Sequence, residues 1–396
     1  MIAETNLETL LRDILATAAL PLERSTTFPP AAYTDEAFYA YEVEAIFKKE
    51  WMCVAHVSQL EGPGSYVDFE LFDEPMVIVR DKAGRIRVLS RVCPHRNMDI
   101  GFGRTPQGTV TSLVCPYHKW TFGLDGRLLG CAEMDRAEGF DKADWPLSEY
   151  RSEIWEGFVF VNFSGDARPL AVQYADFQRA IAPWRAAQLR IVSALDWECP
   201  FNWKVMVENW SESYHHLGAH HRTLHPMMPA QMTWSEPRHR HFMHAHLPYE
   251  PALAARLEEA TREGRKLPGF RPIAGLSAQQ RTEWGLYLGY PCFMFLTAPD
   301  RAIWYRLQPI SAERCKLLTT ILVSQESLAD PDFAATLERE TKLMRDFHLE
   351  DMHINAAVQR GLRSSKAVRG RLGHLEEPVW QIQRYIAERL EASLDE

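Results

Sequence analysis

Residues 202–220 read NWKVMVENWSESYHHLGAH, and they combine a helical pattern with residue types that bind metal ions. At about 100° per residue in a helix, Glu208, Glu212 and His215 fall within an arc of about 60°. Two carboxylates and an imidazole would then share one face with the apolar Phe201 and Val205. Acidic groups among apolar neighbours are costly to bury unless a positive charge meets them. A metal ion is one candidate for that charge.

An explanation without a metal is also available. Glu208 can pair with Lys204 one turn earlier in the helix, and a single histidine is more often a core residue than a ligand. The density of histidines in this segment favours a metal, because four lie close together: His215, His216, His220 and His221.

Helical geometry does not decide which two histidines would bind the metal. His216 and His220 have the i, i+4 spacing of helical neighbours, whereas a straight helix separates His215 and His220 by about 140°. The second pair needs a break in the helix, which Gly218 can supply.

Composition predicts a globular enzyme-sized protein. The 396 residues are enough for two domains, and 46% hydrophobic with 24% charged residues is ordinary for a soluble protein. A net charge of −9 without a dense Lys/Arg run argues against nucleic acid or a membrane as partner. We expect a cytoplasmic protein, because the seven cysteines are odd in number and the charged N-terminal segment is unlike a signal peptide.

Periodicity predicts helices at residues 3–19 and 34–49, the second with Thr34 as N-cap. Short β-rich runs follow, and residues 76–79 and 86–89 predict a hairpin around the turn at 81–84. Further strands, helices and a histidine-rich segment are expected nearer the C-terminus. Strands are predicted at 286–296, 302–309 and 316–324, helices after Pro331 and at 375–392, and a partly exposed strand or loop, with a metal site as the alternative, at 238–246.

Two short Cys/His pairs lie inside the β-rich part. Cys93-Pro94-His95 is followed, nineteen residues later, by Cys115-Pro116-Tyr117-His118. Such a mixed set of thiolates and imidazoles admits zinc or an iron-sulfur cluster. A zinc finger groups its cysteines and histidines separately, whereas each half here carries one of each. This favours a [2Fe-2S] centre of the Rieske type, with thiolates on one iron and imidazoles on the other.

The predicted helix after Pro331 carries a carboxylate where an apolar residue is expected. Its apolar stripe falls within about 80° of arc, and Asp351 sits in the middle of it. A buried Asp needs a compensating charge, so Asp351 is a candidate ligand. The neighbouring Glu350 is better explained as an acid on a solvated face.

With both motifs in place, the chain resembles the terminal oxygenase (α) subunits of Rieske-type ring-hydroxylating oxygenases over nearly its whole length. The family's motif E-N-x-x-D-x-Y-H-x4-H aligns with Glu208, Asn209, Glu212, Tyr214, His215 and His220. The resemblance makes His215 and His220 the iron ligands. It adds Asp351 as the third, because the family takes that ligand from an Asp in a comparable late helix.

The resemblance implies an α+β fold with a small all-β Rieske [2Fe-2S] domain and a catalytic domain of the helix-grip type, in which helices cover an antiparallel sheet. The expected segments are N-terminal helices at 1–49 that pack with the catalytic domain, the Rieske domain at 50–165 and the mononuclear-iron domain at 166–396.

The resemblance also implies the chemistry. Electrons would enter at a cluster bound by Cys93, His95, Cys115 and His118. They would pass to Fe(II), where O2 hydroxylates or dihydroxylates an aromatic or similarly apolar small molecule. Glu212 is the expected electron bridge, because the family's equivalent acid joins a cluster histidine of a neighbouring subunit, which implies a homotrimer. The lack of a convincing G-x-G-x-x-G motif implies an external NAD(P)H-dependent reductase, with a ferredoxin as a further option.

Two departures keep alternatives open. Glu212 replaces the family's usual Asp, as in some oxygenases of quaternary ammonium compounds. The alternative reaction is therefore monooxygenation or N-demethylation of such a cation, held in an aromatic cage from Trp304, Tyr305 or Trp210. Lys119 stands where the family commonly has Gly. A second alternative is a Rieske electron carrier without oxygenase activity, which would lack the mononuclear iron.

Overall fold

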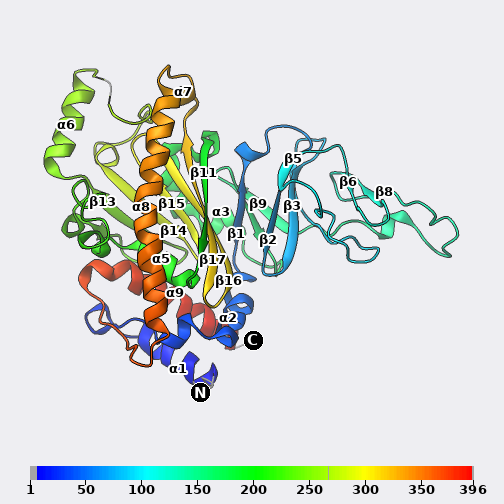
Figure 1. Cartoon of the computed structure of the whole chain (residues 1–396), viewed down its shortest axis with the longest axis horizontal. Helices are drawn as coiled ribbons and strands as arrows, with labels where there is room; N and C mark the ends of the chain where they lie inside the picture. Colours follow the sequence, from blue (N-terminus) through cyan, green and yellow to red (C-terminus); the bar gives the residue numbers. More distant parts are fainter. Residues whose placement is uncertain (1–6, 266, 395–396) are drawn as a thin grey trace. The chain divides into compact units, whose positions relative to one another are not determined.

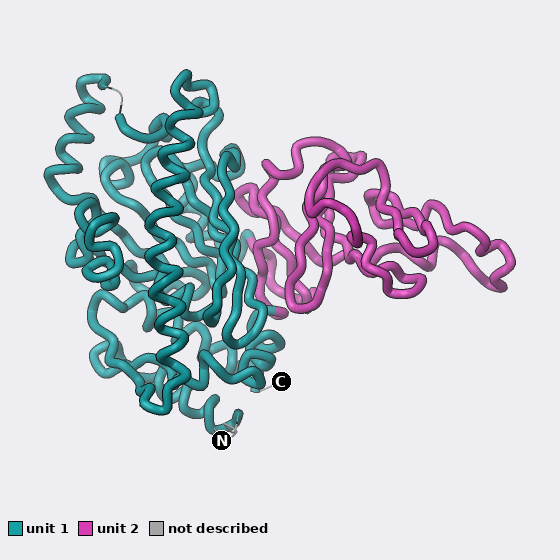
Figure 2. Tube along the Cα trace, in the orientation of Figure 1, with its two compact units in different colours: residues 1–47, 171–396 teal, residues 48–170 magenta. Residues whose placement is uncertain are grey.

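The computed structural model describes residues 7–265 and 267–394 and divides the chain into two compact units (Figure 2). The smaller unit is Lys48–Leu170, and the larger unit combines Met1–Phe47 with Ala171–Glu396. The smaller unit is built mainly from strands, and the larger one combines a sheet with helices. The α+β class predicted from the sequence is confirmed.

The smaller unit consists of three antiparallel sheets. The first is β1 (Met52–His56), β10 (Phe158–Asn162) and β9 (Arg151–Trp155); the second is β4 (Ile86–Ser90), β3 (Glu74–Arg80), β2 (Ser65–Leu71) and β5 (Gln107–Thr109); the third is β6 (Leu113–Val114), β7 (Thr121–Phe122) and β8 (Leu128–Gly130). The predicted hairpin is confirmed as β3 and β4, in which Val77 pairs with Leu89. Cys93 and Cys115 belong to the buried core of this unit.

The larger unit is built on one seven-stranded antiparallel sheet. Its spatial order is β11 (Arg190–Cys199), β17 (Arg314–Val323), β16 (Ala302–Ser311), β15 (Phe293–Thr297), β14 (Glu283–Gly289), β13 (Phe242–Pro248) and β12 (Trp234–Ser235). The strands predicted near the C-terminus are confirmed as β14 to β17. β12 is an edge strand of only two residues.

The α-helices among the described residues are α1 (Leu7–Ala18), α2 (Glu36–Glu42), α3 (Leu170–Gln173), α4 (Ala175–Ile181), α5 (Trp203–Ser211), α6 (Pro251–Arg262), α7 (Gln325–Leu328), α8 (Phe333–Leu362) and α9 (Glu377–Leu394). The longest helix of the larger unit, α8, crosses in front of the seven-stranded sheet in Figure 1, and α1, α2 and α9 lie below it. The long helix predicted after Pro331 is α8, and the last predicted helix is α9. Asp35, not Thr34, is the N-cap of α2, because its carboxylate accepts a hydrogen bond from the Phe38 N–H at 2.8 Å.

The two faces of the sheet are covered by different helices. The ring of Tyr305 in β16 lies 5.3 Å from the ring of His348 in α8. The ring of Tyr287 in β14 lies 5.4 Å from the ring of Phe177 in α4. The strand register places Tyr305 and Tyr287 on opposite faces. α8 therefore covers one face and α4 the other.

α8 buries the first half of the stripe that its sequence predicts, whereas Ile354 and Val358 farther along are 37% and 45% exposed. Met344, Phe347 and Asp351 are 2%, 5% and 8% exposed, so a carboxylate lies among apolar side chains facing the sheet. Within the described ranges, every helix is too short or too polar to cross a lipid bilayer.

Candidate functional site

The first turn of α5 is anchored by a buried ion pair. Asn202 is the N-cap, and its Oδ1 accepts a hydrogen bond from the Lys204 N–H at 2.8 Å. The Lys204 Nζ donates to both oxygens of Glu42 at 2.7 and 2.8 Å, and the Trp203 Nε1 donates to the same carboxylate at 3.1 Å. Lys204 thus pairs with Glu42 and not with Glu208. The Asn-Trp-Lys sequence docks α5 onto α2.

The continuous helical face predicted through Glu208, Glu212 and His215 is wrong, because α5 ends at Ser211. Glu212 is the C-cap, with an extended backbone at φ −121° and ψ 164°. A 3-10 turn over Tyr214–Leu217 follows. Glu208 remains on α5 and accepts a hydrogen bond from the Tyr33 hydroxyl at 2.8 Å.

Glu208 should make stability depend on pH. Burial raises its pKa to about 7, although the Tyr33 hydrogen bond and Lys204 act in the opposite direction. The folded state therefore holds the proton more tightly, so this stabilisation is complete below about pH 4.5 and is lost as the pH rises to about 7. We expect Glu208→Gln to remove this pH-dependent loss in the free energy of unfolding, which is about 3 kcal/mol.

The measurement is urea unfolding of wild type and Glu208→Gln between pH 4.5 and 7.5. Subtracting the two curves isolates the contribution of Glu208 from that of the other ionisable groups, which both proteins share. If the free energies of unfolding of the two proteins change in parallel with pH, Glu208 does not titrate between pH 4.5 and 7.5.

His215, His220 and Asp351 converge in the larger unit. His220 Nε2 lies 2.9 Å from Asp351 Oδ1, and His215 Nε2 lies 3.7 Å from the same oxygen. The ligand atoms of the three residues all lie within 4.8 Å of one another. The turn at Gly218, the C-cap of the 3-10 turn, supplies the break between the two histidines. Two imidazoles and one carboxylate are a donor set that suits non-haem Fe(II).

Each of these histidines is oriented by a second carboxylate. His215 Nδ1 lies 2.8 Å from Glu212 Oε1, and His220 Nδ1 lies 2.7 Å from Glu350 Oε2. A carboxylate on Nδ1 fixes the ring so that Nε2 faces a metal, as metal-bound histidines usually require. Burial alone would raise the pKa of Asp351, but the His220 hydrogen bond and the nearby histidines hold it below its usual value. The residues fit an iron ion.

The prediction that Glu350 lies on a solvated face is wrong, because its carboxylate faces His220. Its carboxylate accepts hydrogen bonds from His220 and, at 2.7 Å, from the Thr223 hydroxyl. The partners are 130 and 127 positions away in the sequence. Only the position of Glu350 beside Asp351 hinted at this role.

His216, the other histidine considered as a ligand, is placed differently. Its Nδ1 lies 3.4 Å from the Met228 carbonyl oxygen. Burial, followed by the charges of His215 and His220, lowers its pKa to about 3. His216 is therefore a neutral buried side chain packed beside the converging residues.

The two Cys/His loops come together in the smaller unit. The rings of His95 and His118 lie 4.7 Å apart, and Cys93 and Cys115 are each 1% exposed. Burial raises the pKa of Cys93 to about 11, and the neighbouring Cys115 thiol also raises it. His118 Nδ1 is buried without a hydrogen-bond partner among the described residues. Two adjacent thiols and a histidine nitrogen that lacks a partner fit a [2Fe-2S] cluster.

The backbone conformation at Lys119 explains why the family commonly has Gly at this position. Lys119 has φ 60° and donates its N–H to the Cys115 carbonyl oxygen at 3.0 Å. This left-handed conformation closes the loop, and glycine adopts it most easily. Lysine adopts it here at a cost of roughly 1 kcal/mol.

Comparisons with known protein families match both units. Residues 186–392 match the catalytic domain of the ring hydroxylating alpha subunit, and residues 50–143 match the Rieske [2Fe-2S] domain. The oxygenase subunit of carnitine monooxygenase from Acinetobacter pittii is 30% identical over 85% of this chain and 85% of that protein. The α subunit of biphenyl 2,3-dioxygenase from Rhodococcus jostii is 31% identical over 51% of this chain and 44% of that protein.

Solved structures of similar fold extend over the same length. The quaternary ammonium Rieske monooxygenase CntA in complex with L-carnitine is 26% identical, with a TM-score of 0.76 over 98% of this chain and 99% of that chain. Naphthalene 1,2-dioxygenase from Rhodococcus is 18% identical, with a TM-score of 0.76 over 98% of this chain and 97% of that chain. The second likeness shows the fold alone.

Proposed function

This chain belongs to the family of Rieske oxygenase α subunits, and on that premise we propose that its two iron centres occupy the two side-chain clusters described above. The family carries a [2Fe-2S] cluster and a mononuclear Fe(II), and its members are oxidoreductases that use O2. The proposed cluster ligands are Cys93, His95, Cys115 and His118, and the proposed iron ligands are His215, His220 and Asp351. The observation that carries the assignment is the convergence of the last three residues with a carboxylate on each histidine.

The protein's own residues orient and insulate the reaction. A 2-His-1-carboxylate site binds Fe(II) on one face and leaves positions for O2 when the metal is present. Glu212 and Glu350 hold the imidazoles by their Nδ1 atoms. The buried stripe of α8 keeps the remaining side of Asp351 out of water.

A cavity of about 330 Å³ in the larger unit is the proposed substrate pocket. Most of its walls are apolar, and they include Met344 and Phe347 from the stripe that carries Asp351. The ring of Phe347 lies 6.5 Å from the ring of His220. The volume of the cavity is in the range of small-molecule pockets.

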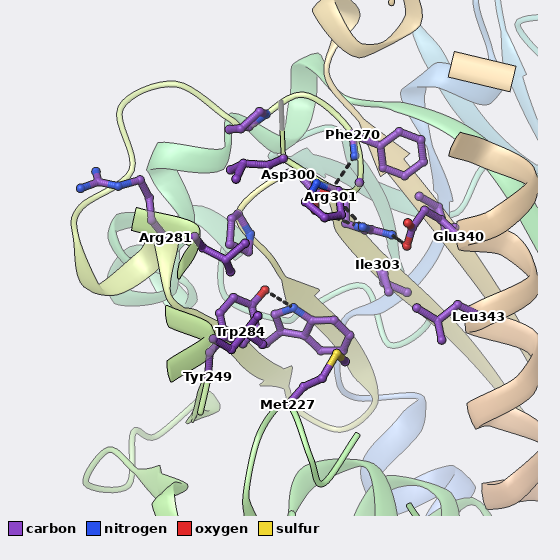
Figure 3. Close-up of a pocket in the computed structure, with 18 of the residues that line it drawn as sticks. Met227, Tyr249, Phe270, Arg281, Trp284, Asp300, Arg301, Ile303, Glu340 and Leu343 are labelled. Atoms are coloured by element: carbon purple, nitrogen blue, oxygen red, sulfur yellow. Dashed lines mark hydrogen bonds and ion pairs between the residues drawn. The ribbon is translucent and has the colours of Figure 1, made fainter. Parts of the chain in front are cut away.

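The charged groups of this pocket disfavour an anionic substrate, because Arg301, a cation among its walls, is already paired with two carboxylates. Arg301 donates to Asp300 at 2.8 Å and to Glu340 at 2.7 Å, so its charge is already matched (Figure 3). The guanidinium of Arg281 extends away from the other labelled side chains (Figure 3). The mostly apolar walls lead us to propose hydroxylation of an aromatic or similarly apolar small molecule.

A second candidate is monooxygenation of a quaternary ammonium compound. The pocket has aromatic walls in Tyr249, Phe270 and Trp284, which suit a cation. The similarity to carnitine monooxygenase favours the same substrate class. The aromatic residues predicted for a cage were Trp210, Trp304 and Tyr305. They are buried and do not line this cavity.

A substrate panel with a surrogate reductase distinguishes the candidates. We expect product from indole or naphthalene, and 18O2 with mass spectrometry then shows whether one or both oxygen atoms enter it. Product from carnitine or γ-butyrobetaine alone would select the second candidate. Fully iron-loaded enzyme that oxygenates neither class would contradict both.

Members of this family take electrons from a reductase or ferredoxin, and we propose an NAD(P)H-dependent donor in the cytoplasm. The seven cysteines form no disulfide among the described residues, which is compatible with a reducing compartment. We also propose a homotrimer in which Glu212 passes electrons between subunits. Glu212 lines a small surface hollow with Trp234, and Tyr214, Leu217 and Trp234 are 52%, 49% and 48% exposed. Apolar side chains exposed around Glu212 fit burial in a subunit interface.

Glu212→Gln should stall turnover while both metal centres stay bound. We expect a loss of roughly 10–100-fold in turnover, because the neutral amide supports His215 less well than the carboxylate and, in addition, no longer bridges to the neighbouring subunit. The decisive measurement is reoxidation of a pre-reduced cluster after substrate and O2 are added. Glu350→Gln is the matched control, since it removes the same support from His220. The cluster should stay reduced in Glu212→Gln and reoxidise in Glu350→Gln. Full coupled activity of Glu212→Gln would exclude the bridge role.

A further inference from the structure

A second group of metal-binding residue types lies on the other face of the sheet. His244 and His246 are two positions apart in β13, so they share one face, and His244 pairs with Tyr287 on that face. This is the face that α4 covers, whereas α8 and Asp351 lie against the opposite one. A partly exposed strand or loop is predicted at 238–246, and residues 238–241 do form a partly exposed loop that leads into β13. The expected exposure is wrong for the two histidines, which are only 6% and 5% exposed.

Glu236 completes the group from the segment that follows β12. Its backbone N–H donates to the His244 carbonyl oxygen at 2.9 Å, which fixes it opposite β13. Its Oε1 lies 3.4 Å from His244 Nδ1 and 3.5 Å from His246 Nε2. The three ligand atoms all lie within 4.8 Å of one another.

The hydrogen bonds of His246 leave its Nε2 facing the Glu236 carboxylate, so that two hydrogen-bond acceptors lie opposite each other. Its Nδ1 lies 2.9 Å from the carboxylate of Glu283, a residue only 7% exposed. The Gln279 Nε2 donates to the other oxygen of Glu283 at 3.1 Å. The same Nε2 lies farther from His246 Nδ1, at 3.3 Å. Nδ1 is therefore the donor, and the lone pair of Nε2 points at Glu236. Nε2 is buried and has no hydrogen-bond partner among the described residues.

The spacing of these atoms is that of ligands around an ion. Two ligands at about 2.0–2.1 Å from a tetrahedral metal are about 3.4 Å apart, which is the separation of Glu236 Oε1 from both histidine nitrogens. The Glu283 carboxylate accepts a hydrogen bond from His246 Nδ1, which is the contact that metal-bound histidines usually make with a second carboxylate.

We propose that Glu236, His244 and His246 form a second metal site, which binds one divalent transition-metal ion of the zinc type. Two imidazoles and one carboxylate suit zinc, and the fourth position is left to water because the Glu236 side chain is 37% exposed. The ion ties the two-residue edge strand β12 to β13. β12 ends the segment that carries Glu212, His215 and His220, so the ion also anchors that segment.

The test is zinc content per chain, measured by mass spectrometry after iron-loaded enzyme is equilibrated with zinc and passed through a desalting column. Wild type should bind one zinc ion and keep its iron. Asp351→Asn should still bind one zinc ion, which shows that the zinc does not occupy the proposed iron site. His246→Gln should bind none. His353→Gln, which changes an exposed histidine of α8, is the matched control and should bind one.

Glu283→Gln provides a variant that keeps all three ligands. We expect its zinc affinity to fall roughly 10–100-fold, measured by competition with a chelator. The proposal is wrong if wild type takes up no zinc, if Asp351→Asn loses the zinc, or if His246→Gln retains it.

Discussion

Asp351→Asn is expected to lower the iron content from three to two per chain while labile sulfide stays at two, and to reduce product formation about 1,000-fold. The amide loses the negative charge and one strong ligand, so His215 and His220 would be left to hold the ion. A metal that supplies several kcal/mol of stabilisation to the reaction accounts for a loss of this size. The measurements are iron and sulfide analysis and product formation with a surrogate reductase.

Asp346→Asn is the matched control on the same helix. Asp346 is 46% exposed and pairs with Lys342 on the surface of α8. Its replacement should leave three irons per chain and normal turnover, because an exposed pair contributes about 0.5 kcal/mol at most. Asp351→Asn with three irons and full turnover would exclude the proposed ligand set. Two irons in the wild type would favour the simple electron carrier.

Sequence patterns predicted the parts of the fold that depend on neighbours along the chain. The hairpin of β3 and β4, the strands β14 to β17 and the helix α8 follow from local periodicity. The position of Asp351 on the apolar stripe of α8 follows from the same periodicity. The pairing of Cys93-Pro94-His95 with Cys115-Pro116-Tyr117-His118 needed only the spacing of two loops.

The rest depends on contacts between distant residues. Glu350 supports His220 across 130 positions, and Tyr33 bonds Glu208 across 175. The local periodicity of a sequence cannot predict contacts between residues so far apart. The helical interpretation through His215 failed because α5 stops at Ser211, with no Gly or Pro there to mark the end. His244 and His246 resemble exposed residues in sequence, since their burial depends on a neighbouring strand and on Glu236.

The least predictable element is the ion pair beneath α5. Glu42 and Lys204 are both completely buried, 162 positions apart. Burial raises the pKa of Glu42 and lowers that of Lys204, while their mutual attraction acts against both shifts. Removing one partner of such a pair leaves an uncompensated charge, whereas removing both is often tolerated. The pair fixes the start of α5 and so the direction in which the chain leaves Ser211 toward His215.

Lys204→Met should therefore lower the free energy of unfolding by about 3–5 kcal/mol, a large part of the roughly 5–15 kcal/mol typical of folded proteins. Urea unfolding followed by circular dichroism measures the loss. The double variant Glu42→Gln/Lys204→Met should recover most of it, because the amide that replaces the Glu42 carboxylate is neutral and still accepts the Trp203 N–H. Lys316→Met is the matched control, since Lys316 is 48% exposed and its pair with Glu198 lies on the surface; its effect should stay within about 0.5 kcal/mol. If Lys204→Met is no more damaging than Lys316→Met, the pair does not anchor α5, and the placement of His215 must depend on other contacts.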